Sequence, residues 1–487
     1  MMFTDLVSDI VSQIEASEVR KRARDASTQI RFNYSVAYLV LDMWKAIQSI
    51  PPRDCLIHKK KAYYSRQLYS DTNVSHRTMM DAFDGLKRLD LIMDETGHKD
   101  LNTGKGILTK YWPTAPMVDM LNALDGHPAI NGVHVETPEP IILRKITKTW
   151  NPETKDTIRS TEDLPYIDTD KTNLFRSNLA TINDCLLRHW PDLELNTADI
   201  PKLAEDMKRS SDKAPIDFSQ RTLVRIFTVG DDAATDRFTL GGRFYRAWWQ
   251  NVPKNYRMLI TIDGERTSEA DYSQLHPQLL YHMAGKDMGN KDAYDRILDG
   301  QHRKLVKQAF NAMLQMSRFS PDGPKDDGFK AGLQKAGITW TTLRDSILKA
   351  HAPVADLFFK GIGNSLQFTD SCIAEKVMLD FAQRDIPVLP VHDSFIVNRH
   401  FEKTGQLEEA MRRAYFEITG HRIGKIDTTL LSWTRGKQPS DMEGHIFRVL
   451  KSISLNFSTD ETKSGWSGRQ QLFKVHREDA LRNSGAY

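Results

Sequence analysis

The sequence predicts an α+β protein that combines helices with antiparallel strands. Apolar residues recur at helical spacing from Tyr38 to Ile47 and again from Leu174 to Trp190. Between residues 386 and 398, two short apolar runs flank the polar pair His392 and Asp393, as in a two-stranded hairpin. The chain has 487 residues, a length sufficient for about two to four domains that each bury their own core.

Composition predicts a soluble protein of a reducing compartment. The three cysteines, Cys55, Cys185 and Cys372, are widely spaced and fit neither a disulfide framework nor a CxxC zinc site. Asp5 and Asp9 stand among the first apolar residues, which differs from the basic start of a signal peptide. No segment is long and apolar enough to cross a bilayer. We therefore expect a cytoplasmic protein with no membrane contact, and the sequence leaves its oligomeric state open.

Local charge is more informative than net charge. The net charge of +3 excludes a wholly basic nucleic-acid coat but allows basic patches beside acidic sites. One basic cluster runs from Lys59 to Lys61 and continues with Arg66 and Arg77, and a second comprises Arg303, Lys304 and Lys307. A solvated face is the alternative interpretation of either cluster.

Residues 1–112 predict a helical segment followed by a winged helix-turn-helix. The helix Tyr38–Ile47 is followed by a turn and by a shorter helix, Ala62–Tyr69. Ser75 can then cap a third helix. Beyond that helix, residues 91–94 and 107–112 bracket a polar loop with glycines at 97 and 104, as two strands of a wing would.

The third helix has the layout of a recognition helix. Its first turn presents His76, Arg77 and Thr78, while apolar residues follow on one face. In a winged helix-turn-helix this helix enters the major groove, and side chains of its first turn meet base edges. Flanking Lys and Arg residues contact phosphates. We therefore expect a specific duplex DNA site as a partner, and a protein-binding winged helix is the alternative.

Two distant acidic residues are candidates for metal-dependent chemistry. Asp271 lies in a segment, residues 267–285, that starts as a strand and becomes a helix after Pro277, and Asp393 lies in the turn of the predicted hairpin. Two carboxylates on adjacent strands can share a pair of divalent ions about 4 Å apart, which activate a hydroxyl and steady a triphosphate. Arg303 and Lys307 are four residues apart and share one helix face that can neutralise a triphosphate. Taken singly, each residue also fits a cap, a turn or a solvated face.

These residues resemble known motifs. Residues 270–274, ADYSQ, resemble motif A of the family-A DNA polymerases, Arg303 to Lys307 with Phe310 and Asn311 resemble motif B, and residues 391–393, VHD, match motif C. Ser394 and Phe395 complete the HDSF of the related phage-type single-subunit RNA polymerases. Upstream, Gly242 with Arg243 and residues 250–253, QNVP, are similar to elements that contact primer and template. The resemblance covers residues 220–435.

The resemblance implies a right-hand polymerase, with an antiparallel-sheet palm, abbreviated helical fingers and a reduced thumb. It implies that Asp271 and Asp393 bind two Mg²⁺ ions, or Mn²⁺, and act in catalysis with Lys307. The nucleotide, dNTP or rNTP, would be bound by Arg303, Lys307, Tyr272, His276, Phe310 and Gln315. Primer and template would be bound by Arg243, Gln367 and His392.

Four departures from the family pattern bear on this function. His276 stands where the family has a Glu that excludes a ribose 2′ hydroxyl, and Gln315 replaces an aromatic residue of motif B. Ser394 stands where DNA polymerases carry a further carboxylate. The spans between the motifs are short, which implies abbreviated fingers.

The domain prediction follows from these assignments. Residues 113–172, rich in Pro, Thr, Asp and Lys, are expected as a linker with some extended pieces, and residues 173–219 as a helical thumb or adaptor. Residues 220–435 would form palm and fingers, and residues 436–487 a C-terminal tail. No exonuclease-type set of carboxylates precedes residue 215.

The leading hypothesis is a DNA polymerase without proofreading, recruited to DNA by its winged helix and encoded by a phage, plasmid or other mobile element. One alternative is a DNA-dependent RNA polymerase or primase. The other is a non-catalytic DNA-binding replication initiator or regulator with a degenerate polymerase fold. Template type, primer requirement and processivity stay open.

Overall fold

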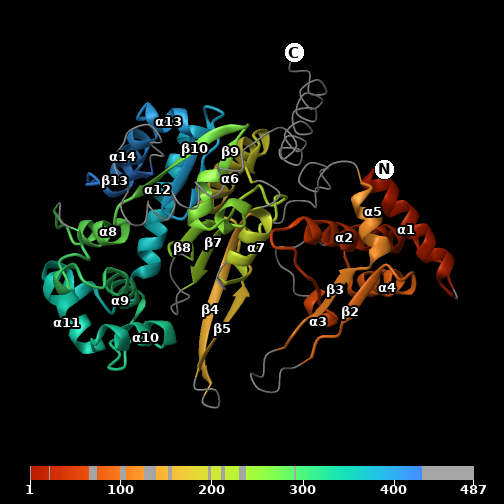
Figure 1. Cartoon of the computed structure of the whole chain (residues 1–487), viewed down its shortest axis with the longest axis horizontal. Helices are drawn as coiled ribbons and strands as arrows, with labels where there is room; N and C mark the ends of the chain where they lie inside the picture. The colour runs from red at the N-terminus through yellow and green to blue at the C-terminus, as the bar shows by residue number, and fades with distance from the viewer. Residues whose placement is uncertain are drawn as a thin grey trace.

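A computed structural model describes residues 2–20, 22–64, 74–98, 106–124, 139–151, 156–195, 199–209, 214–229, 237–289 and 292–429. Within these residues the fold is mixed α+β with mainly antiparallel strand pairs, which confirms the predicted α+β class (Figure 1). Apolar side chains gather into two separate clusters, one formed by the first 124 residues and one by residues 141–426 together with Ile50. No helix in the described ranges has the length and apolar character needed to cross a bilayer.

The N-terminal unit packs helices on a small antiparallel sheet. Its strands, β1 (Cys55–Ile57), β2 (Ile92–Glu95) and β3 (Thr109–Pro113), are ordered β1-β3-β2. Its helices are α1 (Phe3–Ser17), α2 (Ala26–Gln48), α3 (Lys61–Tyr64), α4 (His76–Arg88) and α5 (Ala115–Asn122). The long helices α1, α2 and α4 enclose a buried core that includes Phe32, Val36, Phe83 and Leu86.

Local sequence explains where the helices of this unit begin. The Asp25 carboxylate accepts from the Thr28 backbone N–H at 2.8 Å and starts α2. Ser75 caps α4 in the same way through Thr78. Such caps satisfy backbone donors that have no partner within the helix. The third predicted helix and both predicted wing strands coincide with α4, β2 and β3, whereas Arg66, the second half of the predicted helix Ala62–Tyr69 and residues 99–105 lie outside the described residues.

A four-stranded sheet follows, in the order β5-β4-β7-β8. It comprises β4 (Ile141–Asn151), β5 (Asp156–Asp163), β7 (Val224–Val229) and β8 (Gly241–Tyr245), with β4 parallel to β7 and the other pairs antiparallel. The segment 113–172, expected as a linker with some extended pieces, holds two paired strands and, in addition, the helix α5. The strand β4 forms here because Ile141, Ile142 and Leu143 are fully buried and pair with β7.

The larger sheet is antiparallel throughout and carries the candidate site. Its order is β11-β12-β10-β9-β6, and β13 also pairs with β10. The strands are β6 (Pro191–Leu193), β9 (Ile260–Ile262), β10 (Glu265–Tyr272), β11 (Leu389–Val391), β12 (Ser394–Asn398) and β13 (Ile426–Thr429). The two-residue turn between β11 and β12 consists of His392 and Asp393, as the sequence predicts.

Helices surround both sheets. α6 (Asp170–Arg188) and α12 (Gly363–Ala382) pack on each other, and α12 also contacts β8, α8 (Leu275–Met283) and α14 (Gln406–Thr419). A helical group of α9 (Arg303–Gln315), α10 (Asp327–Ala336) and α11 (Trp340–Ala350) lies apart from the sheets (Figure 1). Four 3₁₀ helices and two further α-helices complete the described elements: Trp248–Asn251, Lys254–Leu259, Leu298–Gly300, Ala352–Leu357, α7 (Ile200–Arg209) and α13 (Arg399–Lys403).

An isolated β-bridge connects the N-terminal unit to the second core. Ile50 and Ile216 exchange two backbone hydrogen bonds of 3.0 and 2.7 Å. Ile50 belongs to the second core although it follows α2 directly. The predicted tail, residues 436–487, lies outside the described residues.

Candidate active site

Asp271 and Asp393 lie next to each other at one end of the large sheet. Asp271 is the penultimate residue of β10 and pairs in register with Ser394 of β12. Asp393 directly precedes Ser394, and its carbonyl oxygen accepts from the Tyr272 backbone N–H at 3.5 Å. Two residues that are 122 positions apart in the chain are thus brought onto neighbouring strands, as the sequence predicts.

Negative charges dominate the surroundings of Asp271. Its Oδ1 atom is buried and accepts no hydrogen bond within the described part of the chain. Burial, followed by the carboxylates of Asp393 and Glu269, raises the pKa of Asp271 to about 8, and Lys254 and Lys307 oppose this shift. A buried carboxylate oxygen with no donor beside a second carboxylate is the oxygen-ligand arrangement that a hard divalent cation fits.

Glu269 is a third acidic residue of the site that the sequence argument missed. It precedes Asp271 by two positions in β10 and therefore points to the same face of the strand. The Ser394 hydroxyl donates to Glu269 Oε1 at 2.6 Å, and the Arg257 guanidinium pairs with the same oxygen at 2.8 Å. The Ser394 side chain is thereby fixed to this glutamate. The sequence did contain an indication of this, because residues two positions apart in a strand point to the same face.

A cluster formed by the half-buried Arg243 and His276 and the buried Asp370 lies close to Asp393. The Arg243 Nε donates to Asp370 Oδ2 at 2.7 Å, and its Nη2 atom donates to the same oxygen. Asp370, which is 2% exposed, was also missed, although it follows Gln367 by one helical turn in α12. Burial raises the pKa of Asp370 to about 6 against the opposing effect of Arg243. Arg243 is therefore held by an ion pair instead of reaching freely toward a primer.

His276 is a neutral member of this cluster. Burial, with a further contribution from the positive charge of Arg243, lowers the pKa of His276 to about 4. Arg243 Nη2 lies 3.1 Å from His276 Nε2 and can only donate, so Nε2 accepts and the proton sits on Nδ1. The imidazole is a fixed, uncharged group close enough to Asp393 for that carboxylate to oppose the lowering of its pKa.

Helix α9 presents its two predicted cations differently. The Lys307 side chain is exposed, and it is close enough to Asp271 to lower the pKa of that carboxyl group. Arg303 pairs with Asp292 at 2.7 Å and with Asp295 at 3.4 Å, and its guanidinium lies over the Tyr294 ring. Lys307 thus faces the carboxylates, whereas Arg303 is held by an acidic loop. Lys254, directly after residues 250–253, is an exposed cation of the site that the sequence argument missed.

Two predicted nucleotide contacts need correction. The Phe310 ring is fully buried and packs edge-on against Tyr294, His351 and Phe358. The Tyr272 side chain is 2% exposed, and its hydroxyl donates to the Met411 carbonyl at 2.6 Å. Both side chains belong to the core because they point to the inner face of their elements.

The remaining predicted contacts are more accessible. Gln315 is exposed at the end of α9, and its amide lies where a Cβ on Gly363 would be. Gln367 is half-buried in the first turns of α12. His392 is exposed in the hairpin turn with a φ of 60°.

In the N-terminal unit, the first turn of α4 presents one of the three predicted side chains. Arg77 is exposed. Thr78 is 1% exposed and bonds to Ser75 and to the Ser35 hydroxyl at 3.0 Å, so it belongs to the helix cap and not to a base-reading surface. The His76 ring is half-buried against Tyr64 and bonds to the Lys59 carbonyl oxygen at 3.0 Å.

Fold and site together define an α+β protein in which two neighbouring carboxylates lie at one end of a sheet with Lys254 and Lys307 nearby. No protein-family model and no curated protein matches the chain. A solved structure that it resembles is the POL domain of Pol1 from M. smegmatis in complex with DNA primer-template and dNTP. The likeness has 14% sequence identity, covers 47% of this chain and has a TM-score of 0.30. The chain spans about half, 51%, of that solved chain, and a TM-score this low defines neither the fold nor the activity.

Proposed function

We propose that the protein is a template-directed nucleotidyltransferase that extends DNA. One observation carries the proposal: Asp271 and Asp393 converge at the end of an antiparallel sheet, and an oxygen of Asp271 is buried without a donor. These carboxylates would hold the divalent ions. When bound, two Mg²⁺ ions supply activation of a primer hydroxyl and neutralisation of charge on the triphosphate.

The surrounding side chains have complementary roles in this proposal. Lys307 and Lys254 lie near the carboxylates and would bind triphosphate oxygens. His276, fixed by Arg243, presents a neutral ring beside the pair and would limit the space for the sugar. Residues 220–435 would form palm and fingers, with α6 and its neighbours in residues 173–219 as thumb or adaptor. The polymerase would lack proofreading.

The N-terminal unit would recruit the enzyme to a duplex. We interpret α4 with β2 and β3 as a winged helix-turn-helix, and the exposed Arg77 in the first turn of α4 supports this interpretation. Lys60 and Lys61 are exposed as well. Cations placed beside such a helix would contact phosphates, so binding would weaken steeply with salt.

The test is primer extension by the parent protein with dNTPs and, separately, with rNTPs. Asp271→Ala and Asp393→Ala are compared with the parent under Mg²⁺ and under Mn²⁺. Full activity in both variants would contradict the proposal. Duplex binding by the parent without incorporation of any nucleotide would favour a non-catalytic initiator.

RNA synthesis is the second candidate, and His276 is the observation that favours it. This residue replaces the glutamate that excludes a 2′ hydroxyl in the family it resembles, and its ring is uncharged. Extension with rNTPs that equals or exceeds extension with dNTPs, especially without a primer, would select this candidate over DNA synthesis.

Arg77→Ala should separate recruitment from catalysis. We expect site-specific duplex binding to weaken by about 1 to 3 kcal/mol, because one base-edge contact is lost, while extension of a generic primer stays intact. The measurement is an electrophoretic shift on the selected duplex together with primer extension. Asp81 in α4 pairs with Arg20 and is not part of the proposed DNA contact, so Asp81→Asn serves as the control. Equal loss of duplex binding and of primer extension would show that α4 also contacts the primer-template during catalysis.

Asp292→Asn should release Arg303 toward the nucleotide. The Arg303–Asp292 ion pair at 2.7 Å competes with a triphosphate for the same guanidinium. We expect a KM for dNTP about 2- to 5-fold lower, the size of an exposed ion pair of about 0.5 to 1 kcal/mol, with little change in kcat. The Asp345→Asn variant removes an exposed carboxylate from α11 and is the control. An unchanged or higher KM would show that Asp292 positions Arg303 productively.

A further inference from the structure

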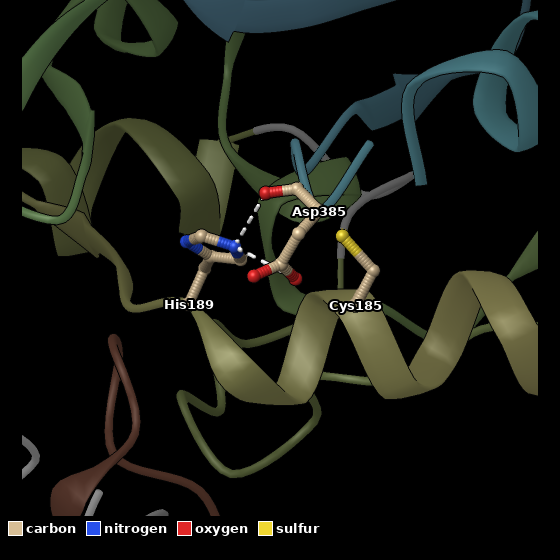
Figure 2. Close-up of side chains that lie close together, drawn as sticks. All are labelled: Cys185, His189 and Asp385. Atoms are coloured by element: carbon tan, nitrogen blue, oxygen red, sulfur yellow. Dashed lines mark hydrogen bonds and ion pairs between the residues drawn. The ribbon is translucent and has the colours of Figure 1, made fainter. Parts of the chain in front are cut away.

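A second group of metal-ligand side chains lies away from the candidate active site. Cys185 belongs to α6 and His189 follows its last residue, so that the two lie one helical turn apart on one face. Asp385 reaches them from the connection between α12 and β11. The cysteine Sγ, a histidine ring nitrogen and a carboxylate oxygen all lie within 4.8 Å of one another (Figure 2).

The histidine is oriented by a further carboxylate. His189 Nδ1 lies 2.5 Å from Asp263 Oδ2, while Nε2 faces Asp385, with the Asp385 carbonyl oxygen at 2.9 Å and Oδ1 at 3.4 Å. A carboxylate on the far nitrogen is the usual partner of a metal-binding imidazole, because it fixes the ring and raises its basicity. Asp263 sits at the tight turn before β10, with a φ of 53°.

The donor set selects the class of ion. A thiolate, an imidazole and a carboxylate together suit Zn²⁺ and similar borderline divalent ions, whereas Mg²⁺ takes oxygen ligands. Bond lengths of about 2.0 to 2.3 Å around a tetrahedral ion require ligand atoms roughly 3.3 to 3.8 Å apart. The three ligand atoms lie within 4.8 Å of one another, so they would have to approach each other by about 1 Å to bind a tetrahedral ion. Arg188 pairs with Asp385 Oδ1 at 2.8 Å, and this oxygen also lies 3.4 Å from His189 Nε2. The second carboxylate oxygen would therefore be the ligand of the ion while Oδ1 holds Arg188.

We propose that Cys185, His189 and Asp385 form a zinc-type metal site, with Asp263 as the carboxylate that orients His189 and water as the fourth ligand. In the metal-free state the buried thiol keeps its proton, and both ring nitrogens face acceptor oxygens. Binding breaks the S–H bond and the Nε2–H bond and releases both protons to solvent. The Sγ and Nε2 lone pairs then bind the ion, and no electrons are transferred.

The location gives this site a structural role. It joins three segments: the end of α6, the turn that leads into β10 and the connection that leads into β11. β10 and the β11–β12 hairpin carry Asp271 and Asp393 at their other ends. At about 3.3 Å per residue, Asp263 lies about 25 Å along the chain direction from Asp271. The ion would therefore clamp the strands that position the catalytic carboxylates without touching the reacting groups.

The test is metal binding by the full chain after treatment with a chelator. We expect one Zn²⁺ per chain in addition to Mg²⁺ binding, and a thiolate-to-metal absorption band in the ultraviolet after loading with Co²⁺. Zn²⁺ should also raise the Tm of the parent protein. Absence of both stoichiometric Zn²⁺ and the Co²⁺ band in the parent overturns the proposal and leaves the cluster as a hydrogen-bonded contact.

Variants locate the ion. Cys185→Ser should abolish the Co²⁺ band, and Asp263→Asn should weaken Zn²⁺ binding about 10- to 100-fold. Cys372→Ser removes a cysteine outside the cluster and should retain the band. Asp271→Ala should bind Zn²⁺ as the parent does, which separates this site from the proposed catalytic one. A Co²⁺ band that survives in Cys185→Ser overturns the assignment, and the parent measurements decide independently of how that variant folds.

Discussion

Asp271→Asn should reduce nucleotide incorporation at least about 10³-fold, equivalent to about 4 kcal/mol of transition-state stabilisation. The amide keeps the shape of the side chain but removes the negative charge that would hold a divalent ion beside Asp393. Asp393→Asn should have a similar effect for the same reason. Single-turnover extension of a primed template measures both variants.

The same substitution should stabilise the metal-free protein at neutral pH. Burial and the neighbouring carboxylates raise the pKa of Asp271 in the fold to about 8, well above the pKa of about 4 in an unfolded chain. Between these values the folded protein binds more protons than the unfolded one, so its stability falls as pH rises. In chelator, the Tm advantage of Asp271→Asn should therefore grow from about pH 5 to pH 8.

An exposed carboxylate distant from the sheet provides the matched control. Asp345 in α11 is 57% exposed, so Asp345→Asn should alter neither incorporation nor the pH dependence of Tm. Near-parent activity in Asp271→Asn, together with a normal fold, would refute the assignment of this residue to the catalytic centre.

Breaking the buried Arg225–Glu375 ion pair should cost about 3 to 5 kcal/mol of unfolding free energy. Arg225 in β7 is fully buried and pairs with Glu375 of α12 at 2.8 Å. Its Nε also donates to the Gly242 carbonyl at 2.9 Å, and its guanidinium lies 4.2 Å from the Phe175 ring centroid. Arg225→Met leaves Glu375 as an uncompensated buried charge between the four-stranded sheet and α12.

Urea denaturation of Arg225→Met against the parent measures this cost. The exposed pair Arg412–Glu408, with both side chains more than 40% exposed, gives the control, and Glu408→Gln should cost less than about 1 kcal/mol. Replacing both buried partners by apolar residues should recover much of the loss, since no charge is then left buried. A loss below about 1 kcal/mol in Arg225→Met would mean that Glu375 finds solvent or another partner.

Sequence reasoning placed Asp271 and Asp393 on neighbouring strands because each lies in a short segment with a local strand pattern and in a motif that resembles one of the family-A DNA polymerases. It could not locate Asp370 as a member of the site, since the role of this residue depends on α12 packing against β8. Glu269 could have been found from the alternation along β10, but it was missed. Phe310 and Tyr272 were predicted to contact the nucleotide but are buried in the core. A motif identifies the residue at a position, but the direction of its side chain depends on how the helix or strand packs. The strands β4 and β5 were hidden because polar residues dominate them outside the buried run at residues 141–143.

β10 has hydrogen-bonded neighbours on both of its edges at Asp271, β12 on one side and β13 on the other. Displacing this aspartate would require two ladders to rupture together, so its backbone amide should be among the slowest in the molecule to exchange with deuterium. In the proposed polymerase, opening and closing around the nucleotide would then fall to α9, the helix that carries Lys307. We therefore expect the strands that carry Asp271 and Asp393 to stay rigid and any conformational change to occur in α9.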